Sequence, residues 1–266
     1  MSPVTDPSIP RLAVTGSTGR VARLLKPFLP GTVWLNRGED AAAIGGCDTL
    51  VCLAGVTGSP ATGLDGNSDV ALEALDAAIR FGIRRVFLMS SAAVYGRASG
   101  LLTVGVPLSP ATPYGEAKAR MEATVARWRC ETATDVAAIC CRLGNVAGAD
   151  GLLGGLAPGM TPDLHIWPDG TSPRRSYIGP RSLAQVVARL AATDDLPEIL
   201  NIAAPGAVAM ADLLEAAGRT WRPVPAPADA IPEVWLDTAP LERLVPLPMA
   251  AATPQGIVAE WREAIA

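Results

Sequence analysis

The sequence of 266 residues contains one histidine, His165, and few aromatic residues, which make up 5% of the chain. A single histidine gives little support for a histidine-based metal site or a Ser-His-Asp hydrolase. We expect His165 to be an ordinary loop or strand-edge residue. Lysine and arginine form no cluster and the net charge is -4, so the composition argues against nucleic acid as a partner.

Long apolar runs are also missing, since the longest extends only from Leu50 to Val56 and is too short to cross a bilayer. Residues 1–10 contain three prolines and no apolar run, which indicates a loose tail and not a signal peptide. The five cysteines form no C-x-x-C pair, and several lie in apolar runs. This usage favours free thiols in a reducing, cytoplasmic compartment.

Short apolar runs alternate with helix-like segments, which predicts βαβ units and a parallel sheet. These runs lie at 12–14, 33–35, 49–53, 86–89, 136–140 and 199–202. Residues with helical spacing between Val70 and Ile79 predict one helix, and a second is expected to begin near Pro113. The chain length is sufficient for one large α/β domain with a small appended lobe.

Two stretches of the second half are rich in proline. Glycine and proline are frequent from Gly148 to Pro173, where we expect a substrate-facing lobe to begin. The stretch from Arg222 to Pro248 is broken into short pieces, and it predicts irregular surface structure packed on that lobe.

A glycine-rich turn follows the first apolar run and opens a helix-like segment. Glycine in such a turn lets the backbone approach a pyrophosphate, while the free N–H groups at the helix start favour its negative charge. Glycine-rich turns also occur for structural reasons, but a position at the first strand-to-helix turn favours dinucleotide binding. The predicted cofactor contacts are Gly16, Ser17, Thr18, Gly19 and Arg20, with Ala22 at the third glycine position.

The end of the second apolar run bears on the choice of cofactor. An NAD enzyme usually has an acidic residue there for the ribose hydroxyls, but this chain has Asn36 followed by Arg37. The missing carboxylate and the cations Arg20 and Arg37 favour a 2'-phosphate, so we expect NADP, with NAD as the alternative. Both arginines are equally compatible with a solvated surface.

Several motifs in register resemble the extended short-chain dehydrogenase/reductase family, also called the NAD-dependent epimerase/dehydratase family. Ser90-Ser91-Ala92-Ala93-Val94-Tyr95-Gly96 resembles its S-S-x-x-V-Y-G strand end, and Tyr114-Gly115-Glu116-Ala117-Lys118 its Y-x-x-x-K helix. Further similar segments are Asp48–Gly55, the helix after Asn67, Arg142–Gly148 and Arg175–Ile178. The resemblance extends over residues 11 to 204.

The resemblance implies a Rossmann-type, doubly wound parallel sheet with a small C-terminal substrate-binding lobe. Residues 11–147 would form the dinucleotide-binding core, and residues 148–266 would complete the sheet and form the lobe. Further cofactor contacts would come from Leu53, Ala54 and Gly55. Substrate contacts would come from Asn145 and Arg175, and a homodimer is possible.

The chemistry explains the need for the Ser91, Tyr114 and Lys118 side chains. Hydride transfer at a carbinol carbon requires proton transfer at its oxygen, and a tyrosine with a pKa of about 10 is a poor base at neutral pH. Lys118 lies one helical turn from Tyr114 and can lower that pKa. By resemblance, Ser91 binds the substrate oxygen, Tyr114 is the acid/base and Lys118 also holds the nicotinamide ribose, whereas Ser90 and Tyr95 are structural.

The sequence also departs from the family pattern. Only ten residues separate Arg37 from Asp48, so the edge strand that carries an adenine contact is expected to be missing. Ala92 and Ala93 replace the Asp-Glu pair of sugar-nucleotide 4,6-dehydratases, which argues against elimination of water. Simple oxidation or reduction and epimerisation of a sugar-like or other small carbonyl compound both remain open. The alternative is a regulator or assembly factor that binds NAD(P) without turnover.

Overall fold

The computed structural model describes residues 10–36, 39–55, 66–155 and 159–266. The expected tail at 1–10, apart from Pro10, and Arg37 lie outside these ranges. The helices are α1 (Arg20–Leu25), α2 (Gly66–Phe81), α3 (Pro113–Glu131), α4 (Pro180–Ala191), α5 (Met210–Ala216), α6 (Ala239–Leu244) and α7 (Pro254–Ile265). Short 3-10 turns are η1 (Lys26–Phe28), η2 (Ala41–Ile44), η3 (Ala92–Tyr95) and η4 (Met249–Ala252).

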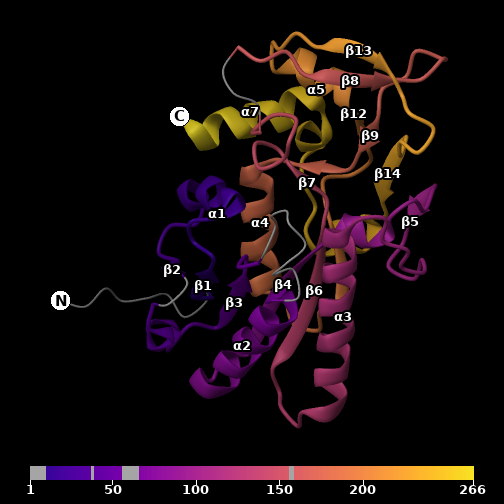
Figure 1. Ribbon diagram of the computed structural model, residues 1–266. Coiled ribbons are helices and arrows are strands. Elements are labelled where there is room, and N and C mark those ends of the chain that lie inside the picture. The colour runs from indigo at the N-terminus through magenta and orange to yellow at the C-terminus, as the bar shows by residue number, and fades with distance from the viewer. Residues whose placement is uncertain (1–9, 37–38, 56–65, 156–158) are drawn as a thin grey trace.

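Within the described residues the central sheet has six parallel strands in the order β11-β6-β4-β3-β1-β2. Its strands are β1 (Leu12–Thr15), β2 (Val33–Leu35), β3 (Thr49–Cys52), β4 (Arg85–Ser91), β6 (Ala137–Leu143) and β11 (Ile199–Ile202). Each one coincides with an apolar run of the sequence. The Rossmann-type, doubly wound parallel sheet is confirmed (Figure 1).

Alternation of side chains along the strands explains why helices cover both faces. Leu50 and Cys52 of β3 pack with α2 and α3, whereas Val51 between them packs with α1, α4 and α7. Because successive residues of a strand point to opposite faces, a continuous apolar run is needed where both faces are buried. Figure 1 shows the α2 and α3 ribbons together and α1 beside α4.

The second lobe lies beyond the carboxyl edge of the central sheet (Figure 1). It contains short pairings: β12-β9-β14-β5, β13 with β8, and β10 with β7. These strands are β5 (Leu101–Leu102), β7 (Asn145–Val146), β8 (Asp163–Ile166), β9 (Arg174–Arg175), β10 (Tyr177–Ile178), β12 (Val208–Ala209), β13 (Arg222–Pro225) and β14 (Glu233–Leu236).

The expectation of irregular surface structure from Arg222 to Pro248 was wrong. The stretch contains β13, β14 and α6, and Leu236 and Leu241 are buried. The prolines are compatible with these elements because Pro223 and Pro225 lie in β13, which has one strand partner, β8, and Pro240 is in the first turn of α6.

The edge strand that the sequence pattern lacks is also absent from described residues 39–48, where the 3-10 turn η2 is found instead.

A buried ion pair joins α3 to the middle of the sheet. The guanidinium of Arg142 on β6 binds the carboxylate of Glu122 on α3, with NH2 2.8 Å from Oε2, and both side chains are at most 6% exposed. Ser90 donates its hydroxyl to Glu122, and Arg142 NH1 donates to the Tyr95 hydroxyl at 3.0 Å. Tyr95 donates in turn to Asn201 at 2.7 Å. The structural roles expected for Ser90 and Tyr95 agree with this network.

All five cysteines are unpaired thiols, and only Cys130 is exposed. Among the described residues, no helix combines the length and apolar character that crossing a bilayer requires.

We expect Glu122→Gln to lower the free energy of unfolding by about 3–5 kcal/mol, because it leaves the buried guanidinium of Arg142 without its counter-charge. Urea denaturation monitored by circular dichroism measures this loss. Glu131→Gln, at the exposed end of the same helix, is the matched control and should stay within about 0.5 kcal/mol of the wild type. Equal stabilities of the two variants would contradict a structural role for the pair.

Candidate active site

The glycine-rich turn packs tightly against the end of β3. Gly16 has a φ of 81°, and a Cβ atom there would lie 2.6 Å from the backbone nitrogen of Ala54. Only glycine therefore fits without displacing the 53–55 segment. The N–H groups of Gly16 and Ser17 donate to Leu35 O, which fixes the turn against β2. Helix α1 begins after Gly19 without a side-chain cap, so its first N–H groups remain available to a ligand.

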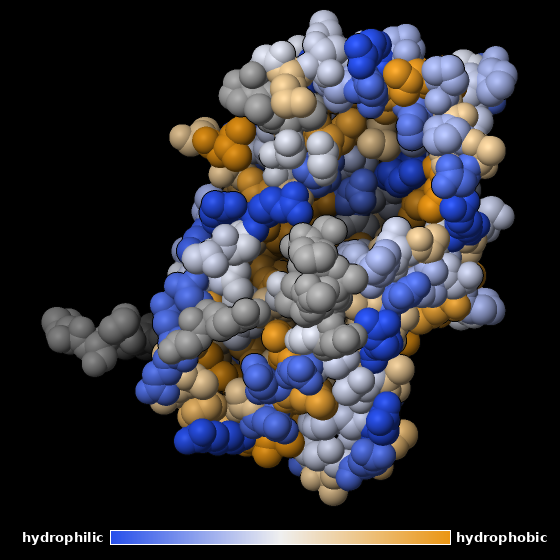
Figure 2. Space-filling view, in the orientation of Figure 1, coloured by the Kyte–Doolittle hydropathy of each residue, from blue (hydrophilic) through white to orange (hydrophobic). Residues whose placement is uncertain are grey.

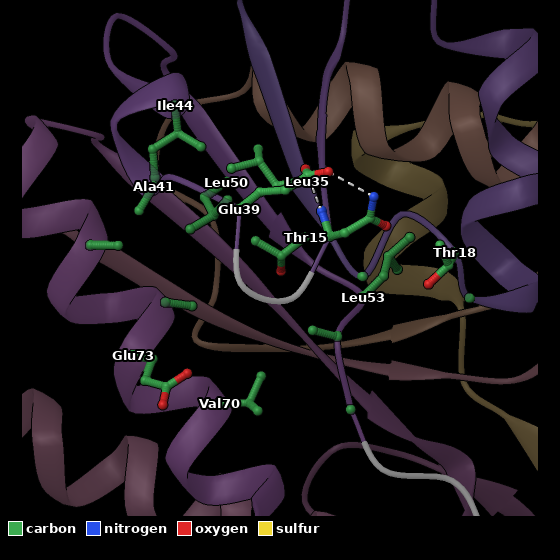
Figure 3. A pocket seen from close by; sticks show the side chains of 17 residues that line it. Thr15, Thr18, Leu35, Glu39, Ala41, Ile44, Leu50, Leu53, Val70 and Glu73 are labelled. Atoms are coloured by element: carbon green, nitrogen blue, oxygen red, sulfur yellow. Dashed lines mark hydrogen bonds between the residues drawn. The ribbon is translucent and has the colours of Figure 1, made fainter.

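A cavity of about 500 Å³ opens between this turn, η2 and α2 (Figure 3). Its apolar wall includes Leu35, Ile44, Leu50, Val70 and Ala74. The predicted cofactor residues among its lining are Gly16, Thr18, Gly19, Asn36, Leu53, Ala54 and Gly55. An apolar slot beside a backbone turn of this kind can take a flat base next to a phosphate group.

Glu39 supplies a carboxylate that the sequence interpretation had considered missing. It lines the cavity and accepts hydrogen bonds from the backbone N–H of Asn36 at 2.8 Å and from its side-chain amide at 2.9 Å (Figure 3). These hydrogen bonds hold the pKa of Glu39 below its usual range. The preference for NADP had assumed that no acidic group was present at this position, and that premise is wrong.

Two other predicted contacts of the turn take different roles. The Ser17 side chain is buried, and its hydroxyl donates to the side-chain oxygen of Asn36, so it connects the turn to the end of β2. Arg20 is exposed at the start of α1, and its charge acts on Tyr114. Arg37 lies outside the described residues.

Ser91 and Tyr114 meet where β4 ends and α3 begins. Ser91 caps η3 by accepting the Ala93 N–H at 3.2 Å, and Thr112 caps α3 by accepting the Gly115 N–H at 3.1 Å. A Cβ atom on Gly115 would lie 2.5 Å from Ala93 O, so glycine allows α3 to approach η3 closely. This approach brings Tyr114 close enough to Ser91 for the two side chains to interact.

Burial dominates the electrostatics of Tyr114. It raises the pKa of the phenol, while the hydrogen bond with Ser91 and the positive charge of Arg20 act in the opposite direction. In the absence of other partners, the phenol is therefore a proton donor at neutral pH.

Lys118 is buried one helical turn after Tyr114. Its Nζ donates to Met89 O at 2.8 Å and lies 5.9 Å from the centre of the Tyr114 ring. Burial lowers the pKa of its ammonium, whereas Cys52, Cys140 and Glu122 favour the charged form. The Nζ also lies 3.3 Å from where a Cβ of Gly55 would be. The ammonium therefore lies next to Gly55, which lines the first cavity.

A second cavity, of about 610 Å³, lies in the second lobe and includes Asn145, Asp150 and Tyr177 in its lining. Asn145 was predicted as a substrate contact, and its place in this lining is compatible with that prediction. Arg175, the other predicted substrate contact, donates its guanidinium hydrogens to the backbone carbonyls of Arg174, Ile231 and Pro232. Most of its hydrogen-bonding capacity is therefore used by the backbone, and its role as an anion contact stays a prediction.

Sequence interpretation missed Glu39 and Glu73 of the first cavity and Glu122 beneath the site. Glu122 follows Lys118 by one helical turn, so its spacing alone placed it on the same helix face. Among the described residues, no group of three histidine, cysteine or acidic side chains is arranged to hold a metal ion.

Known structures share this fold over nearly the whole chain. A UDP-N-acetylglucosamine 4-epimerase from Methanobrevibacter ruminantium M1 superposes with a TM-score of 0.74 at 16% identity, covering 96% of this chain and 99% of the other. DesIV, a dTDP-glucose 4,6-dehydratase from Streptomyces venezuelae, gives 0.72 at 20% identity, covering 95% and 97%. At these identities the likeness establishes the fold alone.

A search among curated proteins gives no match to this sequence. The model of the NAD dependent epimerase/dehydratase family matches residues 33–203, which is more than half of the chain. The match includes Ser91, Tyr114 and Lys118 and begins after the glycine-rich turn. The chain belongs to the NAD dependent epimerase/dehydratase family.

Proposed function

We propose that the chain catalyses hydride transfer between NAD and a secondary alcohol or ketone of a sugar-like compound. The observation that supports this proposal is the position of Lys118 beside Gly55, which lines the first cavity, and one helical turn from Tyr114. Groups that can move a proton and hold a ribose are needed together at that point.

The residues of the first cavity fit a dinucleotide. Gly16 leaves no room for a side chain, and the uncapped start of α1 offers N–H groups to a pyrophosphate. The wall formed by Ile44, Leu50 and Ala74 suits an adenine ring, and the Glu39 carboxylate suits ribose hydroxyls as an acceptor. Lys118, which lies beside Gly55, would hold the hydroxyls of the nicotinamide ribose.

Proton transfer is assigned to Tyr114. In reduction, its hydroxyl gives a proton to the ketone oxygen. In oxidation, its phenolate takes the proton of the alcohol. Ser91 binds the same substrate oxygen and orients it. The Lys118 ammonium and the Arg20 guanidinium favour the phenolate that forms when the proton leaves. Bound NAD supplies the hydride acceptor. The same three side chains serve oxidation, reduction and epimerisation. Only epimerisation returns the hydride to the substrate, on the opposite face.

Sugar-like substrates are favoured by the solved relatives, among them a UDP-glucuronic acid 4-epimerase from Bacillus cereus. Its fold superposes with a TM-score of 0.72 at 16% identity, covering 96% of this chain and 99% of that chain. Elimination of water is not part of the proposal because η3 carries Ala92 and Ala93, which have no acid or base to offer.

We expect Tyr114→Phe to reduce turnover by at least about 10²-fold while leaving NADH affinity nearly unchanged, since the hydroxyl moves a proton and makes no other contribution. Lys118→Met should differ by weakening NADH binding as well. Turnover is followed by NADH absorbance on an alcohol first identified with the wild type, and affinity by fluorescence titration. Full activity of Tyr114→Phe would remove Tyr114 from this role.

NADH should bind roughly tenfold more tightly than NADPH at low salt, because a 2'-phosphate would lie beside the ionised Glu39 carboxylate. Glu39→Gln removes that repulsion and should bring the two affinities together. Asp76→Asn removes a charge from the exposed side of α2 and serves as the matched control. A wild type that prefers NADPH would show that Glu39 does not select the cofactor.

The pH dependence of alcohol oxidation should depend on Arg20. Burial raises the pKa of Tyr114, so the rate should increase through the alkaline range as the phenolate forms. Arg20 lowers this pKa, and its loss in Arg20→Gln should therefore shift the rise in kcat/KM to higher pH. Arg23→Gln, on the same helix, should leave the profile in place. Coincident profiles for all three proteins would exclude an electrostatic role for Arg20.

A further inference from the structure

The second cavity adjoins the residues that carry the proposed chemistry. Ser91 on β4 is paired with Leu143 on β6, and Asn145 follows two residues later and lines the cavity. Asn145 is paired with Tyr177, which also lines it. Figure 2 shows one face of the molecule, with a hollow that has hydrophilic side chains around it. A substrate held at Ser91 can therefore extend into this cavity.

Volume does not decide which substrate enters, because about 610 Å³ is within the ordinary range for cofactor and nucleotide sites. Charge is more selective. The charged residues in the lining are Asp150, Asp163 and Arg222. The guanidinium of Arg222 forms a bidentate ion pair with the Asp163 carboxylate. Nε donates to Oδ1 at 2.6 Å and NH2 donates to Oδ2 at 2.8 Å. Among the described residues of the lining, the only cation is therefore already paired.

Asp150 is left without a cationic partner among the described residues. Its carboxylate accepts the Tyr177 hydroxyl at 2.6 Å and the Leu153 N–H at 3.1 Å, which are neutral donors. They position the carboxylate but leave its charge uncompensated, so an anion brought into the cavity would be repelled.

The neighbouring arginines of β9 do not line this cavity, and most of their donor groups are used elsewhere. Arg174 on β9 binds the Glu233 carboxylate and Ala207 O, and Arg175 donates to three carbonyl groups. The segments 56–65 and 156–158, which lie outside the described ranges, contain no lysine or arginine in their sequence and so add no cation. Diphosphates are commonly bound by cationic side chains, and Arg222 of this lining is already paired with Asp163.

We propose that the second cavity takes a compact, non-nucleotide substrate that presents hydroxyl or amino groups and carries no phosphate or carboxylate. Carboxylate and amide oxygens accept hydrogen bonds from hydroxyl groups, and Asp150 additionally favours an ammonium. This inference rests on the proposed hydride transfer, and it separates the chain from relatives that are crystallised with nucleotide sugars, such as MoeE5 with UDP-glucose.

Uridine diphosphate is the probe, titrated by calorimetry into protein saturated with NADH so that the first cavity is filled. The wild type should show no saturable binding up to about 1 mM. Asp163→Asn releases the Arg222 guanidinium and should increase affinity by about tenfold or more. Asp163→Asn/Arg222→Gln should return to the wild-type result. Saturable binding by the wild type that Arg222→Gln abolishes would overturn the proposal.

The substrate class is tested by incubating the protein and NAD⁺ with a panel of sugars and polyols and measuring the NADH that forms. NADH should form with neutral or amino sugars and polyols and not with uronates, sugar phosphates or nucleotide sugars. Asp150→Asn should admit uronates by removing the repulsive charge. The two proposals fail separately: protein that binds no NADH contradicts the proposed function, whereas turnover of a nucleotide sugar contradicts only the substrate class.

Discussion

The buried pair of Glu122 and Arg142 is the interaction on which the geometry of the site depends. It joins α3, which carries Tyr114 and Lys118, to β6, and through the Ser90 hydroxyl it also holds β4 immediately before Ser91. The three proposed reactive side chains therefore lie on two elements that share one anchor. A pair this deeply buried gains little net stability over apolar packing, but the loss of one partner is costly, so it defines a single arrangement of α3 on the sheet.

Residues that follow the carboxyl ends of the central strands line both cavities. Gly55 follows β3 and lines the first cavity, and Asn145 follows β6 and lines the second. Parallel strands make this possible because all of their carboxyl ends meet at one edge. In the proposed function, the Glu39 carboxylate selects the cofactor and the Asp150 carboxylate selects the substrate.

The central sheet was predictable because its strands are buried on both faces and read as apolar runs. The proposed roles of Ser91, Tyr114 and Lys118 came from the resemblance to family motifs, while spacing placed Tyr114 and Lys118 on one helix face. The short strands of the second lobe were not, because β9 and β14 are set by pairing between Arg174 and Glu233, 59 residues apart. For the same reason, the partner of Glu122 could not be derived from spacing, because Arg142 lies on another element 20 residues away.

The most direct test of the account is a crystal structure of the chain with NAD⁺. The account predicts that the adenine ring packs against Ile44 and Leu50 and that the adjacent ribose lies at Glu39. The nicotinamide ribose should accept a hydrogen bond from Lys118 Nζ, with the nicotinamide ring beside Ser91 and Tyr114. A nicotinamide ring bound away from Tyr114, with Lys118 making no contact to the cofactor, would contradict it.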